Sequence, residues 1–265
     1  MASDDPGTSL VEQAWDEAAL GYDSYFAPRF APYLGAAIGA LVGRSAELPS
    51  GPILVPCTGP GHELQPLARA FDRREIHASD LSLTMVKLAR QRVATFPNVF
   101  VEQSDATRLS VPNGGASAIV SVFGLQLLPN PSQTLGSWLA LLNRRGLAVI
   151  VYWPRDAEPS GPFHSMRQLL RSAGILDGTW ESELHGRILG SGAKLLADSP
   201  LAFEIAHESS QTAWSALTHL GPLRGLALAR GDAFVAELGQ QFVAELPEGK
   251  LVHTPEARLL VIERG

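Results

Sequence analysis

The chain is poor in cysteine and in long apolar runs. Cys57 is the single cysteine among 265 residues, so no internal disulfide can form. No apolar run approaches the roughly 20 residues that a membrane-spanning helix needs. Residues 1–6 have neither the basic region nor the apolar stretch of a signal peptide. These absences predict a cytoplasmic protein in a reducing compartment, without membrane association.

Clustered positive charge is also missing. The net charge is −6, and the lysines and arginines are scattered along the chain rather than gathered in a run. Because non-specific nucleic-acid binding depends on clustered cations that neutralise phosphates, the composition disfavours a nucleic-acid partner. No group of histidine, cysteine and acidic residues has the spacing of a metal site, so no metal is predicted.

What the chain does have is an apolar strand that breaks into a loop of small residues. Residues 53–56 are predicted to form the strand, and the loop 57–61 (Cys-Thr-Gly-Pro-Gly) follows it. A helix comes next, because apolar residues recur at the spacing of one helix face, at Leu64, Leu67, Ala68 and Phe71. The following apolar run, 76–80, ends in Asp80. A small-residue loop lets the backbone approach a ligand, and an acid on the neighbouring strand can hold a ribose diol. The unit therefore predicts a nucleoside-binding site.

The same loop argues against a phosphate-bearing ligand. Glu63 falls in the first turn of the helix, where its carboxylate would repel a pyrophosphate held at the helix N-terminus. The third glycine of a dinucleotide loop is missing, and no Gly-Lys-Ser/Thr follows. A nicotinamide oxidoreductase and a triphosphate-binding protein are therefore disfavoured. A nucleoside without phosphates fits better, and S-adenosylmethionine is the commonest such cofactor.

Strand-like and helix-like segments alternate through the first part of the chain, which predicts a parallel α/β sheet. Strands are expected near 53–56, 76–79, 99–102, 118–123 and 147–153, with helical patterns between them. The nearly continuous apolar run 148–153 is typical of a strand covered on both faces. Further on, we expect a helix near 181–196, a strand at 201–207, helices from 209 and over 232–246, and a last strand at 258–263.

These features resemble the class I S-adenosylmethionine-dependent methyltransferases, most closely the small-molecule group that includes the ubiquinone and menaquinone methyltransferases. Beyond the loop, the resemblance rests on Ser79-Asp80-Leu81-Ser82, on Ser104-Asp105-Ala106, on Phe123-Gly124-Leu125-Gln126 with the Leu-Pro-Asn-Pro turn after it, and on Trp15-Asp16 and Tyr22-Asp23. It implies a Rossmann-like α/β fold, with a central, mostly parallel sheet, helices on both faces, and an N-terminal and an inserted helical lid.

The resemblance also implies a cofactor, S-adenosyl-L-methionine, with S-adenosyl-L-homocysteine as the product. It assigns the ribose hydroxyls to Asp80, the adenine amino group to Asp105 and the methionine end to Tyr22. The residues implied to bind the cofactor are Tyr22, Cys57, Thr58, Gly59, Pro60, Gly61, Asp80, Leu81, Met85, Ser104, Asp105, Ala106, Phe123 and Gly124. Ser82 is expected to cap the helix that follows it.

Two positions depart from the family pattern. Val55 stands where the family has Asp or Glu, and Cys57 stands where it has Gly. The acid that helps to hold the methionine ammonium is therefore missing, and loop carbonyls and water would have to replace it. These departures leave open a second class of function, a protein that binds the cofactor without methylating, as a regulatory or auxiliary subunit or as a non-methylating catalyst.

The acceptor is expected to be a small, largely apolar molecule, enclosed by the N-terminal helices and by segments 154–180 and 209–240. The predicted walls of its pocket are Tyr25, Phe26, Trp153, Phe163, Met166 and Trp214. No catalytic residue is identified, but His164 and His219 are candidate general bases because histidine suits proton abstraction near neutral pH. His185 and His207 fall in the same region of the resemblance. Stretches 159–162 and 221–225, rich in glycine and proline, are expected hinges.

With 265 residues and 45% apolar side chains, the chain is long enough for one sizeable core. We predict one folded domain of four segments, namely an N-terminal helical cap (1–50), a cofactor-binding Rossmann-like core (51–155), a helical lid (156–200) and a C-terminal part of the core with acceptor-pocket helices (201–265). The sequence leaves a homodimer open and does not name the acceptor.

Overall fold

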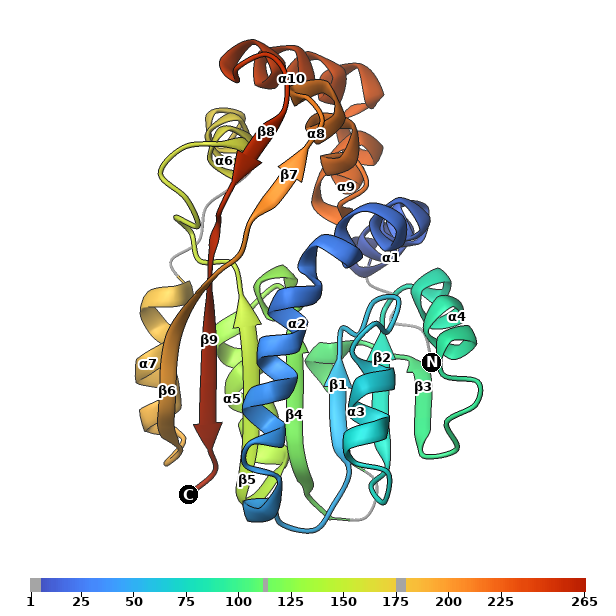
Figure 1. Ribbon diagram of the computed structural model, residues 1–265, viewed down its shortest axis with the longest axis vertical. Coiled ribbons are helices and arrows are strands. Elements are labelled where there is room, and N and C mark those ends of the chain that lie inside the picture. Colours follow the sequence, from blue (N-terminus) through green and yellow to red (C-terminus); the bar gives the residue numbers. More distant parts are fainter. Residues whose placement is uncertain (1–5, 112–113, 175–179) are drawn as a thin grey trace. The chain divides into compact units, whose positions relative to one another are not determined.

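The computed structural model describes residues 6–111, 114–174 and 180–265 (Figure 1). The chain divides into two compact units, and each unit is made of three chain segments. Unit 1 comprises Met1–Phe30, Asp156–Asp177 and Ala202–Glu256, and unit 2 comprises Ala31–Arg155, Gly178–Leu201 and Ala257–Gly265. Residues 1–5 of the N-terminus and 175–179 of the predicted lid lie outside the described residues. The four-segment division predicted from the sequence stays a prediction.

Unit 2 holds a mostly parallel sheet. Its strands are β1 (Ile53–Pro56), β2 (Ile76–Asp80), β3 (Val99–Gln103), β4 (Ala116–Val122), β5 (Leu142–Tyr152), β6 (Lys194–Ala202) and β9 (Glu256–Glu263). Among the described residues, their order across the sheet is β3-β2-β1-β4-β5-β9-β6. β1 pairs in parallel with β2 and with β4, whereas β9 runs antiparallel to β5. The strand order reverses between β1 and β4, and open α/β sheets bind their ligands at such a reversal. The predicted Rossmann-like fold is confirmed.

The core of unit 2 is apolar because helices cover the strands. Every residue of β1 is buried, which explains its unbroken apolar run. The helices are α2 (Ala27–Val42), which begins in unit 1, and α3 (Leu64–Ala70), α4 (Leu83–Arg92), α5 (Pro131–Leu141) and α7 (Trp180–Gly190). Trp138, Leu184 and Ile188 from α5 and α7 join one buried cluster with β4 and β5. The helix face predicted after the loop is confirmed, since its four apolar residues are buried.

Unit 1 is mainly helical. It contains α1 (Pro6–Gly21), the π-helical turn η1 (Tyr22–Phe26), α6 (Pro162–Ser172), α8 (Ser210–Leu217), α9 (Gly221–Arg230), α10 (Asp232–Glu245) and the strands β7 (Ile205–His207) and β8 (Leu251–His253). β7 and β8 form an antiparallel pair. Helices approach closely at glycines, where a Cβ on Gly221 would lie 2.2 Å from the ring of Trp15, and one on Gly239 would lie 2.2 Å from the ring of Trp214. Among the described residues, no helix has both the length and the apolar character that crossing a membrane requires.

Three local predictions were wrong. The strand expected at 201–207 is interrupted at residues 203–204, since β6 ends at Ala202 and β7 begins at Ile205. The helix expected near 181–196 ends at Gly190, and β6 begins at Lys194. Gly192 adopts a φ of +73°, which ends the helix, and the residues after it pair at the edge of the sheet. The stretch 221–225, expected to be a hinge, is the first half of α9, because a proline in the first turn favours a helix start.

Candidate functional site

The loop after β1 has a backbone that only certain residues adopt easily. Cys57, Gly59 and Gly61 all have left-handed φ angles, of 55°, 55° and 77°. A Cβ added at Gly59 would meet no atom within 4 Å, so the backbone there borders open space. A Cβ at Gly61 would come within 2.9 Å of Ala89, so this glycine permits the close approach of α4. The conformation of Cys57 explains why the family has glycine at this position, since a side chain there costs about 1–2 kcal/mol.

The thiol of Cys57 serves packing rather than reactivity. Burial raises the pKa of Cys57 far above its usual range, and Asp80 and Asp105 raise it further. A Cβ added at Gly124 would lie 2.4 Å from the Cβ of Cys57, so the loop after β4 contacts the loop after β1 at these two residues. Because a thiol must ionise to act as a nucleophile, the raised pKa disfavours a nucleophilic role for Cys57.

Asp80, at the end of β2, holds the loop and the next helix in place. Its Oδ2 accepts a hydrogen bond from the backbone N–H of Gly59 at 2.8 Å, and its Oδ1 accepts one from the N–H of Ser82 at 3.0 Å. Ser82 then caps α4, with its Oγ accepting from the N–H of Met85 at 3.1 Å, so the predicted cap is confirmed. Asp80 is partly exposed. Its carboxylate therefore lies beside the open face of Gly59, while its role toward a ribose stays a prediction.

Thr58 and Glu63 face the interior. The Thr58 hydroxyl donates to Glu63 Oε1 at 2.6 Å, and both side chains are buried. Burial raises the pKa of Glu63 to about 7, partly offset by the hydrogen bond from Thr58. The side chain of Thr58 is thus engaged inside the protein. Its backbone is what remains to line a ligand site.

The segment after β3 lies beside Asp80. The N–H of Ser104 donates to the backbone carbonyl of Asp80 at 2.9 Å. Asp105 caps a short 3-10 turn (Ala106–Arg108), where its Oδ1 accepts from the N–H and the hydroxyl of Thr107, each at 2.8 Å. The carbonyl of Ala106 accepts from the Trp138 indole N–H at 2.8 Å. The loops after β1, β2 and β3 are thus tied together at the carboxyl ends of the strands.

After β4, Phe123 belongs to an aromatic cluster. Its backbone is left-handed, with a φ of 60°, and its ring stacks on Trp153 at 4.4 Å with an interplanar angle of 3°. The ring of Tyr33 packs edge-on against both, at 5.4 Å and 5.0 Å. The structure thus brings Trp153, predicted for the acceptor pocket, together with Phe123, predicted for the cofactor site. Tyr33 was not predicted, because an apolar helix stripe gives no sign of which ring it meets.

In unit 1 the predicted residues fall into separate groups. Tyr22 packs against Trp15 at 5.7 Å and against Phe26 and Phe30, each at 6.3 Å. The Tyr25 hydroxyl and His207 Nδ1 are 2.7 Å apart, and Phe163 packs edge-on against His253 at 5.1 Å. Met166 lies on α6 and is partly buried. Sequence reasoning missed His253 and Glu158, which hydrogen bond to each other, since no local pattern marks residues so far apart in the chain.

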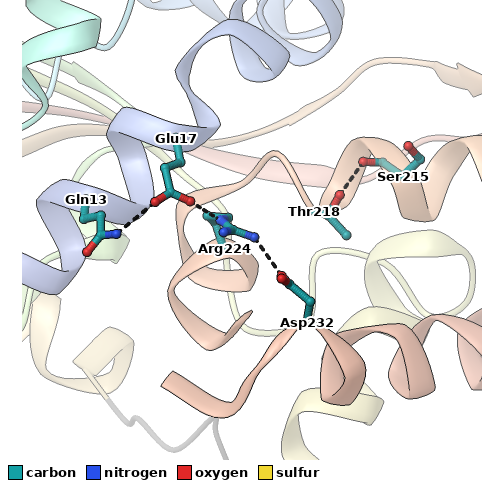
Figure 2. Close-up of polar contacts among 6 residues, drawn as sticks. All are labelled: Gln13, Glu17, Ser215, Thr218, Arg224 and Asp232. Atoms are coloured by element: carbon teal, nitrogen blue, oxygen red, sulfur yellow. Dashed lines mark hydrogen bonds and ion pairs between the residues drawn. The ribbon is translucent and has the colours of Figure 1, made fainter. Parts of the chain in front are cut away.

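A cavity of about 910 Å³ lies within unit 1, among α1, α8, α9 and α10. Trp214 and His219 both line it, together with the pair Glu17 and Arg224. Figure 2 shows Arg224 between two carboxylates, with Nε donating to Glu17 and Nη1 to Asp232 at 2.9 Å, while Gln13 donates to Glu17 at 2.9 Å. The charges on this wall are therefore already paired within the protein.

The candidate histidines occupy different settings. His164 is partly exposed on α6, with its Nε2 3.4 Å from Gln168 Nε2, and His219 is exposed. His185 is exposed on α7, and its Nε2 lies 3.2 Å from Asp198. Of the histidines named in the sequence analysis, His207 is the one buried in a polar network. The described residues hold no group of three or more His, Cys, Asp or Glu side chains placed to bind a metal ion.

Known proteins resemble this chain in part of its sequence and in its fold. Residues 53–146 match the family model described as "Methyltransferase domain". No curated protein matches the sequence. Magnesium protoporphyrin IX methyltransferase (ChlM) of Synechocystis PCC 6803, with bound S-adenosylmethionine, is 13% identical with a TM-score of 0.59, and the match covers 100% of each chain. The YcgJ protein of Bacillus subtilis is 13% identical with a TM-score of 0.59, covering 87% of this chain and 98% of its own.

One further protein whose solved structure has this fold is named for a different activity. The [4+2]-cyclase SpnF is 13% identical with a TM-score of 0.53, and the match covers 86% of this chain and 79% of that one. At such low sequence identities, the likeness to these solved structures shows that this chain shares their fold.

The fold and the loop site thus define a Rossmann-like protein with a nucleoside-type cradle at the carboxyl ends of its strands. Residues 53–146 match a methyltransferase domain, and the fold is that of class I S-adenosylmethionine-dependent methyltransferases such as ChlM, so the resemblance seen in the sequence is confirmed. S-adenosylmethionine is the cofactor of this class. The cradle fits it, since the backbone at Gly59 is open and the Asp80 carboxylate lies beside it.

Proposed function

We propose that this protein transfers the methyl group of S-adenosylmethionine to a small organic acceptor and releases S-adenosylhomocysteine. The observation that carries the proposal is the loop 57–61, with three left-handed residues and a carboxylate on the N–H of Gly59. Such a loop presents backbone to a nucleoside. The net charge of −6 supports a small molecule as acceptor rather than a nucleic acid.

In this proposal, the chain's own residues bind the cofactor and orient it. The loop 57–61, Leu81 and Met85 would line the cofactor, Asp80 would accept hydrogen bonds from the ribose, and Ser104 to Ala106 would meet the adenine. When bound, the cofactor supplies a methyl group already activated by its sulfonium. The protein therefore needs mainly to align the acceptor and to exclude water. In this proposal, few residues take part in the chemistry itself.

The position of Val55 bears on how the methionine end is held. Val55 is buried in β1 and pairs with Ala78 of β2, so no carboxylate is available there. We propose that backbone carbonyls and water hold the ammonium in its place. This arrangement lowers affinity relative to a paired charge, because a neutral carbonyl lacks the attraction that a carboxylate has for the ammonium.

A second candidate function is binding of the cofactor without methyl transfer. Two observations favour it, namely the missing acid at Val55 and the existence of a cyclase, SpnF, with the same fold. In that case the bound sulfonium would act as a fixed positive charge, and no methyl group would leave it.

One experiment separates the two. Purified protein is incubated with methyl-labelled S-adenosylmethionine and a panel of small phenols, alcohols and amines, and label transfer and S-adenosylhomocysteine are both measured. Transfer to a panel member supports the methyltransferase. Calorimetric binding of S-adenosylmethionine without any transfer favours the second function. Absence of binding would contradict both, and Asp80→Ala protein serves as the control for background transfer.

A further inference from the structure

The cavity of unit 1 has the size of a small-molecule site. Its volume is about 910 Å³, within the range of about 300–1,000 Å³ that such sites have. The residues that line it come from α1, α8, α9, α10 and the turn between α8 and α9, and all of them belong to unit 1. Three of them, Ala236, Gln240 and Ala244, are exposed, so a ligand can enter from solvent.

Glycines on neighbouring helices hold two rings of the cavity wall in place. A Cβ added at Gly239 would lie 2.2 Å from the indole of Trp214, and one at Gly21 would lie 2.2 Å from the imidazole of His219. The indole also packs against Phe242, with the ring centres 5.1 Å apart. Rings that are already confined lose little freedom when a ligand binds. This part of the wall is therefore preorganised.

The rest of the wall is mainly apolar. Trp214 is partly exposed, and it lines the cavity together with smaller apolar side chains. These are Leu223, Ala227, Val235, Ala236, Val243 and Ala244. An aromatic ring beside small aliphatic side chains is the usual surface against which the apolar body of a ligand packs.

The polar side of the cavity carries more negative than positive charge. Figure 2 shows the Arg224 guanidinium between the carboxylates of Glu17 and Asp232. Hydrogen bonds from Gln13 and Arg224 lower the pKa of Glu17, so Glu17 is a carboxylate at neutral pH. One guanidinium thus serves two carboxylates, and one negative charge is in excess.

These polar groups can still accept hydrogen bonds. Arg224 contacts Asp232 at Oδ1, which leaves Oδ2 outside that ion pair, and each carboxylate oxygen can accept more than one hydrogen bond. The Thr218 hydroxyl donates to the carbonyl of Ser215 at 2.7 Å, so toward a ligand it can act only as an acceptor. A ligand that donates hydrogen bonds therefore fits this side of the cavity.

The surrounding helices add to the negative potential. α1 and α10 carry three acidic residues each, α9 carries two arginines, and α8 carries no charged residue. A cleft lined by an excess of one charge attracts ligands of the opposite charge. The field therefore favours a cation and disfavours a phosphate or a carboxylate.

We propose that this cavity binds a small amphipathic amine, with an aromatic or aliphatic body and one protonated amino group. The body packs against Trp214 and the apolar face of α10, and the ammonium donates to Glu17 and Asp232. An ammonium has three donors and no acceptor, which matches the acceptors on this side. The inference goes beyond the proposed function and does not depend on it, since no residue of the loop 57–61 lines the cavity.

Three probes with one ring system and different charge test the ligand class. They are 2-(1-naphthyl)ethylamine, 2-(1-naphthyl)ethanol and 1-naphthaleneacetic acid. Calorimetry at pH 7 and low salt should show saturable binding of the amine, about threefold or more tighter than the alcohol, because an exposed ion pair contributes modestly. The acid should bind most weakly. High salt should bring the affinity of the amine toward that of the alcohol, since salt screens exposed charges.

The indole of Trp214 reports where the amine binds. In protein labelled with nitrogen-15 tryptophan, the amine should shift the Trp214 indole signal, which Trp214→Phe identifies by its loss. The shift should saturate at the same amine concentration as the calorimetric binding. Saturable binding that leaves the Trp214 signal in place would overturn the site.

Two matched pairs of variants on α10 test the cavity and its charge. Ala236→Trp fills the cavity and should abolish binding of the amine and the alcohol, whereas Ala233→Trp, at an exposed alanine outside the lining, should keep both. Asp232→Asn should weaken the amine about threefold and leave the alcohol unchanged. Glu237→Gln, at an exposed glutamate outside the lining, should change neither affinity.

Several results would contradict the proposal. Equal amine affinity in Ala236→Trp and Ala233→Trp would place the amine elsewhere on the protein. If Ala236→Trp does not fold, the ratio of amine to alcohol affinity in Asp232→Asn decides, and an unchanged ratio overturns the proposal. Absence of amine binding, or tighter binding of the acid, would also overturn it. None of these results bears on the proposed function, which label transfer from S-adenosylmethionine tests separately.

Discussion

Asp80 combines two interactions on one carboxylate. It accepts from the N–H groups of Gly59 and Ser82, and it is still partly exposed toward the open side of the loop. Asp80→Ala removes these acceptors together with the proposed ribose contacts, each worth about 1.5–3 kcal/mol. We expect calorimetric affinity for S-adenosylhomocysteine to fall more than tenfold. Asp72→Ala, an exposed acid after α3, is the control, and an unchanged affinity in Asp80→Ala would remove Asp80 from the site.

Glu63 makes stability depend on pH. In the folded protein its pKa is raised from 4.5 to about 7, because the side chain is buried. As pH rises from 4.5 to 7, the unfolded chain loses this proton while the folded protein keeps it, so the wild type loses stability across that window. The loss is at most about 3.5 kcal/mol, from about 1.4 kcal/mol per pKa unit between 4.5 and 7.

Glu63→Gln keeps an acceptor for Thr58 and removes the titration. Urea unfolding at pH 5 and at pH 8 should therefore show the variant gaining stability relative to wild type at the higher pH. Glu102→Gln, at an exposed glutamate of β3, controls for the loss of one negative charge. An equal difference between Glu63→Gln and wild type at both pH values would mean that Glu63 is not buried as a neutral acid.

In the helices of unit 1, glycine positions differ in how much space they leave for an added Cβ. A Cβ at Gly239 in α10 would lie 2.2 Å from Trp214, whereas one at Gly225 in α9 would meet only Ala14, at 3.6 Å. Gly239→Ala should destabilise the protein by about 1–3 kcal/mol through overpacking. Gly225→Ala should stabilise it by up to about 1 kcal/mol, since alanine is the better helix former. Equal shifts in the urea midpoint for the two variants would contradict the close contact of α10 with Trp214.

Strands with a strong apolar pattern could be predicted, and the edge strand β6 could not. β1, β4 and β5 were predicted because burial on both faces gives continuous apolar runs. β6 was missed because its residues are mostly half-buried or exposed, and its strand form depends on pairing at the sheet edge. For the site, the loop 57–61 has a local signature, whereas the contact between His207 and His253 depends on β7 pairing with β8.

For the whole chain, the two units interleave in sequence, so no single boundary separates them. Each is assembled from three segments. All proposed cofactor contacts except Tyr22 belong to unit 2. Ligand binding can therefore distinguish the two units in an experiment, because a ligand stabilises the folded parts that it binds.

Amide hydrogen exchange, measured with and without S-adenosylhomocysteine, makes this distinction. At about a hundredfold excess over Kd, binding stabilises the folded state by about 2.7 kcal/mol. Amides of β1, β2, β4 and the loop 57–61 should then exchange more slowly, and those of α8, α9 and α10 should change little. Protection at Tyr22–Phe26 would place Tyr22 at the cofactor, and its absence would remove Tyr22 from the site. Asp80→Ala should lose the effect, and equal protection by NAD would contradict a loop selective for a nucleoside without phosphates.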